Sequence, residues 1–210
     1  MSPPNYSPLI IIAGNLGVGK TTLMQAICAT RPDLQPFWEE PEIRPFQPGL
    51  ATNPQRWSAI NQVDFFIHRA NQERIARTNQ QISIFDGSLD QDYYVFARYL
   101  RHLGHLTTPE FDLCTRTYTL LRQLLPPPDL IIHLTAPPDT LSTRRAQRAR
   151  PRDLAITPDD RLPLFATYLN EWLNLTNIPI YTLPSSDTPT FEPHLNPLIH
   201  YLNQHFPPLS

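Results

Sequence analysis

The chain has 210 residues and a formal net charge of −2, so its length fits one α/β domain and its charge gives no general attraction to nucleic acid. No apolar run approaches the roughly 20 residues that a membrane span needs, and the N-terminus lacks the basic and apolar segments of a signal peptide. The two cysteines, Cys28 and Cys114, form no metal-binding or disulfide pattern. We therefore expect a cytoplasmic protein without nucleic-acid or membrane partners.

Short apolar runs alternate along the chain with longer segments of helical character. Residues 1–8 are a polar, proline-containing tail that we expect to be flexible, and residues 9–206 are expected to form one domain. Strands are expected at 9–12, 35–39, 82–86, 130–134 and 178–183. Helices are expected at 21–29, 54–80, 89–103, 110–125, 140–150, 159–175 and 191–206, with a proline-rich loop at 42–54. This alternation predicts a three-layer α/β fold, in which helices cover both faces of a parallel five-stranded sheet.

The loop after the first strand fits the pattern G-x-x-x-x-G-K-[ST], with Gly14, Gly19, Lys20 and Thr21 at the fixed positions. Glycines allow backbone N–H groups to surround phosphate oxygens, and Lys20, the only lysine in the chain, supplies a compact cation. A turn without a ligand is the alternative, but the single lysine favours a P-loop that binds a nucleoside triphosphate. Thr21 would also hold Mg²⁺. The predicted phosphate contacts are Gly14, Asn15, Leu16, Gly17, Val18, Gly19, Lys20, Thr21 and Thr22.

Acidic residues follow two of the predicted strands, at the edge where parallel sheets bind ligands. Glu40, which precedes Pro41, is the candidate general base for a hydroxyl group, and its neighbour Glu39 is the rival. Asp86 ends a buried strand and is a candidate Mg²⁺ ligand opposite Thr21, although an acid in this position can also cap the next helix.

Five arginines are concentrated between residues 144 and 152. Arg144 and Arg148 are one helical turn apart and share a face of the predicted helix. The cluster stands at the end of a helix and beside a loop, so residues 144–158 can close over a triphosphate as an arginine-rich lid. A solvated basic face is the other interpretation, and the P-loop favours the lid.

Several segments together resemble the deoxynucleoside kinase family, which includes deoxycytidine, deoxyguanosine and deoxyadenosine kinases. They are GNLGVGKTT, the Glu40-Pro41 pair, PQRWSAINQVDFFIHR, FDGSLDQDYYVFARYL and TRRAQRARPRD, in that order over nearly the whole chain. The resemblance implies that the protein transfers the γ-phosphate of ATP, with Mg²⁺, to the 5′-hydroxyl of a deoxynucleoside. It implies that Glu40 is the base, and that a homodimer forms through the helices at 54–80 and 89–103.

The resemblance also assigns binding residues. Gln62, Arg69 and Asp92 would read the nucleobase, and Asp153 would hold the 3′-hydroxyl of the sugar. The matching lid arginines are Arg144 and Arg148, which would bind phosphate, and Arg150, which would act in catalysis with Lys20. The arginine and aspartate at positions 69 and 92 favour purine or deoxycytidine substrates over thymidine, and among these we lean towards a purine.

Two positions depart from the family pattern. The family usually has an arginine where this chain has Gly87, and often has a sugar-contacting tyrosine near Ala51. Arg44, in the proline-rich loop, is our candidate to replace the missing arginine. The departures leave two alternatives, a non-catalytic nucleotide-binding protein or a P-loop kinase for another small molecule such as a nucleoside monophosphate. A GTPase switch is disfavoured, because its guanine-reading Asn-Lys-x-Asp motif needs a second lysine.

Overall fold

The computed structural model describes residues 6–38, 44–148, 161–185 and 191–208. The predicted site residues Glu40, Arg150 and Asp153 lie outside these ranges. The side chains of Ala51 and Arg148 are also outside the description. The described ranges contain no helix that is both long enough and apolar enough to span a membrane.

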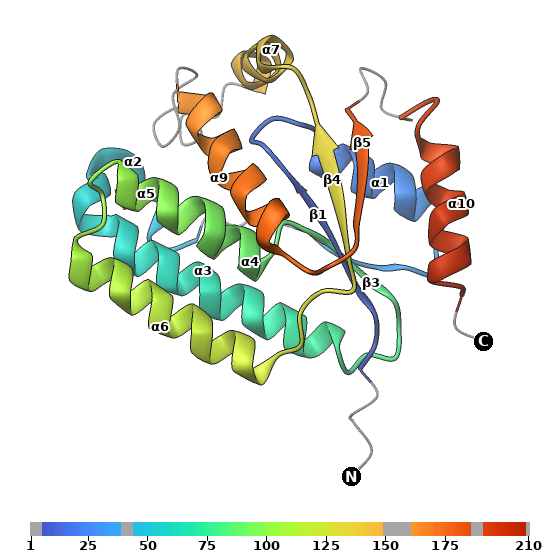
Figure 1. Ribbon diagram of the computed structural model, residues 1–210, viewed down its shortest axis with the longest axis horizontal. Helices are drawn as coiled ribbons and strands as arrows, with labels where there is room; N and C mark the ends of the chain where they lie inside the picture. The colour runs from blue at the N-terminus through green and yellow to red at the C-terminus, as the bar shows by residue number, and fades with distance from the viewer. Residues whose placement is uncertain (1–5, 39–43, 149–160, 186–190, 209–210) are drawn as a thin grey trace.

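Five parallel strands form one sheet in the order β2-β3-β1-β4-β5 (Figure 1). The central strand β1 pairs with β3 and β4, and all of its residues are buried. Burial on both faces explains why β1 is a continuous apolar run. The predicted α/β class and the five parallel strands are confirmed. The strands are β1 Leu9–Gly14, β2 Gln35–Phe37, β3 Ser83–Asp86, β4 Leu130–Thr135 and β5 Ile180–Pro184.

Helices cover both faces of the sheet (Figure 1). Ile10 and Ile12 of β1 belong to a core with α1 Lys20–Thr30 and α10 Leu195–His205. Leu9 and Ile11 belong to the core on the opposite face, which includes Trp172 of α9 Leu162–Leu175. Alternate residues of one strand therefore contribute to different cores, as the pleat of a strand requires.

A third core lies between the helices beside the sheet, where Phe66, Leu100 and Tyr118 are buried together. It joins α3 Pro54–Ala76 and α6 Thr108–Leu124, which run side by side in Figure 1, to an irregular helical segment. That segment consists of α4 Leu89–Gln91, the π-helix η1 Asp92–Ala97 and α5 Arg98–His102. The prediction of one regular helix over 89–103 is therefore wrong in its central turns. The helix that follows β4 is α7 Pro138–Arg148.

The structure corrects other boundaries near prolines. The range 42–54, predicted as a loop, contains the short helix α2 Gln47–Thr52. Pro48 stands in its first turn, where backbone N–H groups have no partner within the helix, so the N–H that proline lacks costs no hydrogen bond. α6 starts before Pro109 for the same reason, and the Glu110 carboxylate accepts a 2.7 Å hydrogen bond from the N–H of Thr107. α3 ends at Ala76 instead of 80.

The first described residues are tied to the domain. The N–H of Ser7 donates to the carbonyl oxygen of Arg77 at 3.2 Å, and Nη1 of Arg77 donates to the carbonyl oxygen of Ser7 at 2.8 Å. These two hydrogen bonds hold the end of the predicted tail beside the C-terminus of α3, just before β1 begins.

A buried ionic network fastens the irregular helix to α3 and α6. Arg122 of α6 donates to both carboxylate oxygens of Glu73 at 3.0 and 3.2 Å, and its Nη2 lies 3.2 Å from Oδ2 of Asp90. The hydroxyl of Tyr118 donates to Oδ1 of Asp90 at 2.7 Å. Burial raises the pKa of the Glu73 carboxyl, while the Arg122 guanidinium acts in the opposite direction. One arginine therefore balances two carboxyl groups removed from water.

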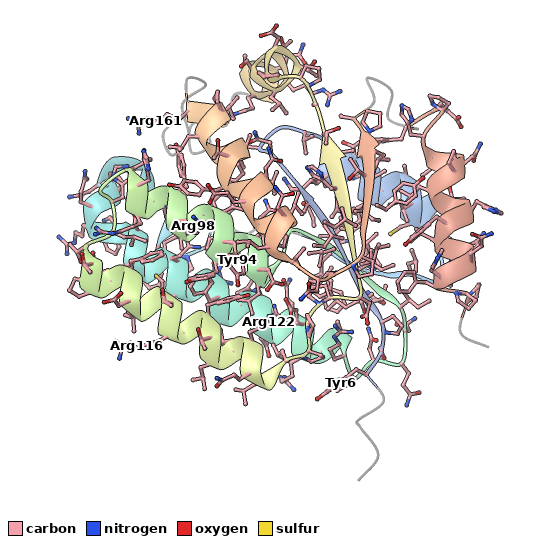
Figure 2. The ribbon with its side chains drawn as sticks, viewed as in Figure 1. Tyr6, Tyr94, Arg98, Arg116, Arg122 and Arg161 are labelled. Atoms are coloured by element: carbon pink, nitrogen blue, oxygen red, sulfur yellow. The ribbon has the colours of Figure 1, made fainter. Side chains whose placement is uncertain are left out.

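Replacing Arg122 with leucine should lower the free energy of unfolding by about 3–5 kcal/mol, because it leaves Glu73 and Asp90 buried without their cation. Urea unfolding at neutral pH measures the change. Arg116→Leu on the same helix is the control, since Arg116 is exposed and projects from the surface (Figure 2). It should cost less than about 0.5 kcal/mol. Similar losses in the two variants would contradict the importance of the network.

Candidate active site

The phosphate loop, residues 14–20, connects β1 to α1 at the carboxyl edge of the sheet. Gly17 has φ of 81°, a left-handed conformation that favours glycine, and a Cβ there would lie 2.7 Å from Cγ of Arg145. Nζ of Lys20 donates to the carbonyl oxygens of Gly14 at 3.4 Å and Asn15 at 3.3 Å. The ammonium group therefore lies over the loop, beside a helix N-terminus that favours anions.

The two predicted metal ligands are in direct contact. Oγ1 of Thr21 donates to Oδ2 of Asp86 at 2.5 Å. The register of the sheet explains the contact, because Ile12 of β1 pairs with Asp86 of β3 and both strands end at the same edge. Oxygen donors of this kind suit Mg²⁺. The helix after β3 is capped by Ser88, whose Oγ accepts from the N–H of Gln91 at 3.0 Å, so Asp86 is not needed for that purpose.

The helix α7 brings two arginines onto the phosphate loop. Nη1 of Arg144 donates to the carbonyl oxygen of Val18 at 3.1 Å and to Oγ of Ser185 at 2.5 Å. Arg145 is buried, and its aliphatic part packs against Gly17. Arg144 was expected at the phosphates, whereas Arg145 was not singled out. The residue pattern does not distinguish Arg145 from the other arginines of the cluster, because only the packing of α7 shows which side faces the loop.

One cavity extends from the phosphate loop to the inner side of α3. Lys20, Asp86 and Gly87 line it, and so do Gln62 and Asp92. Its apolar lining comes from Leu16, Leu50, Phe65, Phe96 and Leu100. The residues predicted for phosphate and for a nucleobase therefore meet in a single space, with apolar surface for a planar ring between polar groups.

The three predicted base-reading residues are close together. Nε2 of Gln62 donates to the carbonyl oxygen of Asp92 at 2.7 Å, and Nε of Arg69 lies 3.6 Å from Oδ2 of Asp92. Nη1 of Arg69 also donates to Oε1 of Gln72 at 3.4 Å. The Gln62 amide uses one of its two N–H groups within the protein, which leaves Oε1 to accept a hydrogen bond from a ligand and the second N–H to donate one.

The irregular helix links the two ends of the cavity. Its π-helical part begins at Asp92, and single π-helical turns are frequent at functional sites. One residue earlier, Nε2 of Gln91 donates to the carbonyl oxygen of Gly14 at 3.2 Å. The segment that presents Asp92 to the cavity is therefore hydrogen-bonded to the phosphate loop.

At Gly87, where the family pattern has an arginine, the neighbouring guanidinium comes from another part of the chain, α3. Its φ is 84°, and a Cβ at this position would lie 3.0 Å from Nη2 of Arg69. Arg44, our candidate replacement, makes hydrogen bonds of 2.8 and 2.7 Å to Asp64. Among the described side chains, the guanidinium that lies against Gly87 is therefore that of Arg69.

The sequence analysis missed seven of the residues that line the cavity. They are Gln47, Leu50, Asn61, Phe65, Gln91, Phe96 and Leu100. Each lies in a helix and has an ordinary residue type for that position, so the pattern of the sequence does not distinguish it from a packed or solvated side chain. The predicted positions of the base, Glu40, and of the lid residues Arg150 and Asp153 fall outside the described residues.

Comparison with known proteins identifies one family. The family model described as deoxynucleoside kinase matches residues 10–205. The deoxyguanosine kinase of Lactobacillus acidophilus is 27% identical over 151 residues, which are 68% of this chain but only 64% of that enzyme. The deoxyadenosine/deoxycytidine kinase of Bacillus subtilis is 26% identical over 152 residues, 70% of this chain and 68% of that enzyme.

Solved structures show the same fold. Deoxyadenosine kinase from M. mycoides, in a structure with the products dCMP and a flexible dCDP, superimposes with a TM-score of 0.80. The alignment covers 93% of this chain and 99% of that chain at 19% identity. A second structure of that enzyme, with bound dATP, gives a TM-score of 0.78 at 20% identity, with the same coverage of both chains.

Gly87→Ala should weaken the binding of deoxyadenosine about tenfold, because a methyl group 3.0 Å from Nη2 of Arg69 would shift the guanidinium relative to Asp92. Titration calorimetry measures the affinity. Gly104→Ala is the matched control, since Gly104 also has positive φ, 70°, but a Cβ there meets no atom within 4 Å. Equal losses of affinity in the two variants would show that backbone strain alone is responsible.

Proposed function

Since the chain belongs to the deoxynucleoside kinase family over residues 10–205, we propose that it is an enzyme that transfers the γ-phosphate of ATP to the 5′-hydroxyl of a deoxynucleoside. The observation that carries the proposal is the cavity that Lys20 and Asp86 share with Gln62 and Asp92. A triphosphate on the loop and a nucleoside on α3 would meet there, and bringing reactants together supplies much of the rate enhancement in phosphoryl transfer.

The phosphate end supplies positive charge and oxygen ligands. Lys20 and the loop N–H groups would hold the phosphates, and Arg144, with Arg148 and Arg150 from the predicted lid at 144–158, would neutralise the charge of the transferred group. Thr21 and Asp86 would hold Mg²⁺, and their hydrogen bond at 2.5 Å supports this by setting two oxygen donors of the kind that Mg²⁺ prefers side by side. Bound Mg²⁺ supplies further charge neutralisation at the phosphates.

The other end of the cavity would bind the nucleoside. Gln62, Arg69 and Asp92 would pair with the polar edge of the base, and Asp153 would hold the 3′-hydroxyl. Phe65 and Phe96 provide apolar surface for the ring. Arg69 and Asp92 suit a purine or deoxycytidine, and a purine is favoured between them because relatives are named deoxyguanosine kinases.

The proposed general base is Glu40, which would accept the proton of the 5′-hydroxyl. Glu40→Gln keeps the shape of the side chain but removes its basicity, so kcat should fall by roughly 10²–10⁴. Transfer from radiolabelled ATP to each of the four deoxynucleosides measures this. Glu39→Gln is the control and should retain nearly full activity. The opposite ranking would assign the base to Glu39, and a wild-type protein that phosphorylates none of the four would favour the non-catalytic alternative.

We also propose a homodimer, supported by an apolar surface on α3 and α6. Its exposed residues recur about two turns apart along α3 and one or two turns apart along α6, so each set forms a stripe on one side of its helix. No large exposed apolar side chain is found in 89–103 within the described part of the chain, so the second helix of this surface is α6 instead. The surface consists of Ile60, Ile67, Ile75, Leu113, Leu120 and Leu124.

Ile67→Glu should give a monomer, because it places a charge within the proposed interface. Light scattering at micromolar concentrations measures the mass. Leu175→Glu on α9 is the control, since Leu175 is 71% exposed and lies outside the surface on α3 and α6. It should leave the dimer intact. A wild-type protein of monomer mass across this range would contradict the proposal.

A further inference from the structure

Asn61 is a buried amide that lines the cavity, and its oxygen has no hydrogen-bond partner among the described residues. It precedes Gln62 in α3, is only 4% exposed and lines the cavity. Its Oδ1 is shielded from solvent and accepts no hydrogen bond from any residue that the structure describes. A buried polar atom left unpaired destabilises a fold, so such atoms are rare unless a ligand or water pairs with the group.

A second buried polar atom on α3, Oγ of Ser58, has no hydrogen bond to a described residue but does not line the cavity, so it serves as a comparison for Asn61. Ser58, one turn before Asn61, is completely buried, and its Oγ also makes no hydrogen bond within the described ranges. Ser58 does not line the cavity, whereas Asn61 does. Both residues carry the cost of an unpaired polar atom, but only Asn61 belongs to the lining of the cavity.

The neighbouring groups limit what Asn61 can recognise. One N–H of the Gln62 amide donates to the carbonyl oxygen of Asp92, so Gln62 keeps its oxygen and its second N–H for a ligand, and Arg69 and Asp92 complete a polar set at this end of the cavity. These three residues provide enough partners for one edge of a base. Asn61 adds a second amide, whose oxygen and nitrogen can exchange places by rotation. A base that pairs with this amide as well must have a second polar edge.

Purines have such an edge, because N7 is a hydrogen-bond acceptor beside the substituent at C6, whereas pyrimidines carry carbon at the corresponding position. We propose that Asn61 is a specificity-determining residue whose carboxamide, turned so that its nitrogen replaces the unpaired oxygen, donates a hydrogen bond to N7 of a purine deoxynucleoside. This inference rests on the proposed function and deepens it. A pyrimidine in the same place would exclude water from the amide and leave it unpaired, so it would bind more weakly.

The test uses 7-deaza-2′-deoxyadenosine and 7-deaza-2′-deoxyguanosine, in which carbon replaces N7. Affinities of the full-length protein for each analogue and its parent are measured by calorimetry, and kcat/KM by phosphate transfer. The wild type should lose about tenfold with the analogue of its preferred purine, the usual effect of one buried hydrogen bond. Asn61→Leu, which is nearly isosteric, should bind that parent and its analogue equally well. Ser58→Ala should keep the wild-type preference.

A wild type that does not distinguish the analogues from their parents overturns the inference, and this measurement needs no variant to fold. An equal preference in the wild type and Asn61→Leu overturns it as well. Purine binding that depends on N7 and Asn61 in a protein without transfer activity would uphold the inference while refuting the proposed kinase activity. A wild type that binds none of the four deoxynucleosides refutes both.

Discussion

The parallel pairing of β1 with β3 is the constraint on which the candidate site depends. The register places Ile12 beside Asp86, so the acid at the end of β3 stands next to the start of the phosphate loop. Thr21, in the first turn of α1, then reaches Asp86 across the gap between the strand ends. A slip of one residue would turn Asp86 to the other face of the sheet and remove this contact. The apolar residues of β1, buried on both faces, oppose such a slip because it would exchange the side chains of two cores.

The nucleoside end of the site is held by contacts of another kind. Regular strands position the phosphate loop, but Asp92 lies where the helix widens into a π-helical turn. Two neighbours in sequence fix that turn on opposite sides. Gln91 donates to the phosphate loop, and Asp90 is held by Tyr118 and Arg122 of α6. The ionic network is therefore more than a local stabilising feature, since it determines where the irregular helix lies relative to α3 and thus where Asp92 faces Gln62.

The parts of this arrangement that could be predicted are those encoded over a few residues. The phosphate loop is specified by glycines and one lysine at fixed spacing, and the central strands are continuous apolar runs. Asp86 follows from its position at a strand end. The π-helical turn arises from packing against α3 and α6, and α2 arises from packing against α3. Neither was predicted, because the residues of these two segments do not indicate that packing. Asn61 could not be found from the sequence, because its importance lies in the absence of a partner, and only the folded structure shows which polar atoms are paired.

The single lysine has a consequence for chemical modification of this protein. The other 16 of the 17 lysine and arginine residues are arginines, so an acyl group transferred to a lysine can reach only Lys20. Its ammonium lies over the carbonyl oxygens of Gly14 and Asn15, at the place predicted for phosphate. Acylation would remove the positive charge and fill the loop with a neutral chain. Modifications that are spread harmlessly over many surface lysines in other proteins would here act on one position, as an all-or-none inactivation.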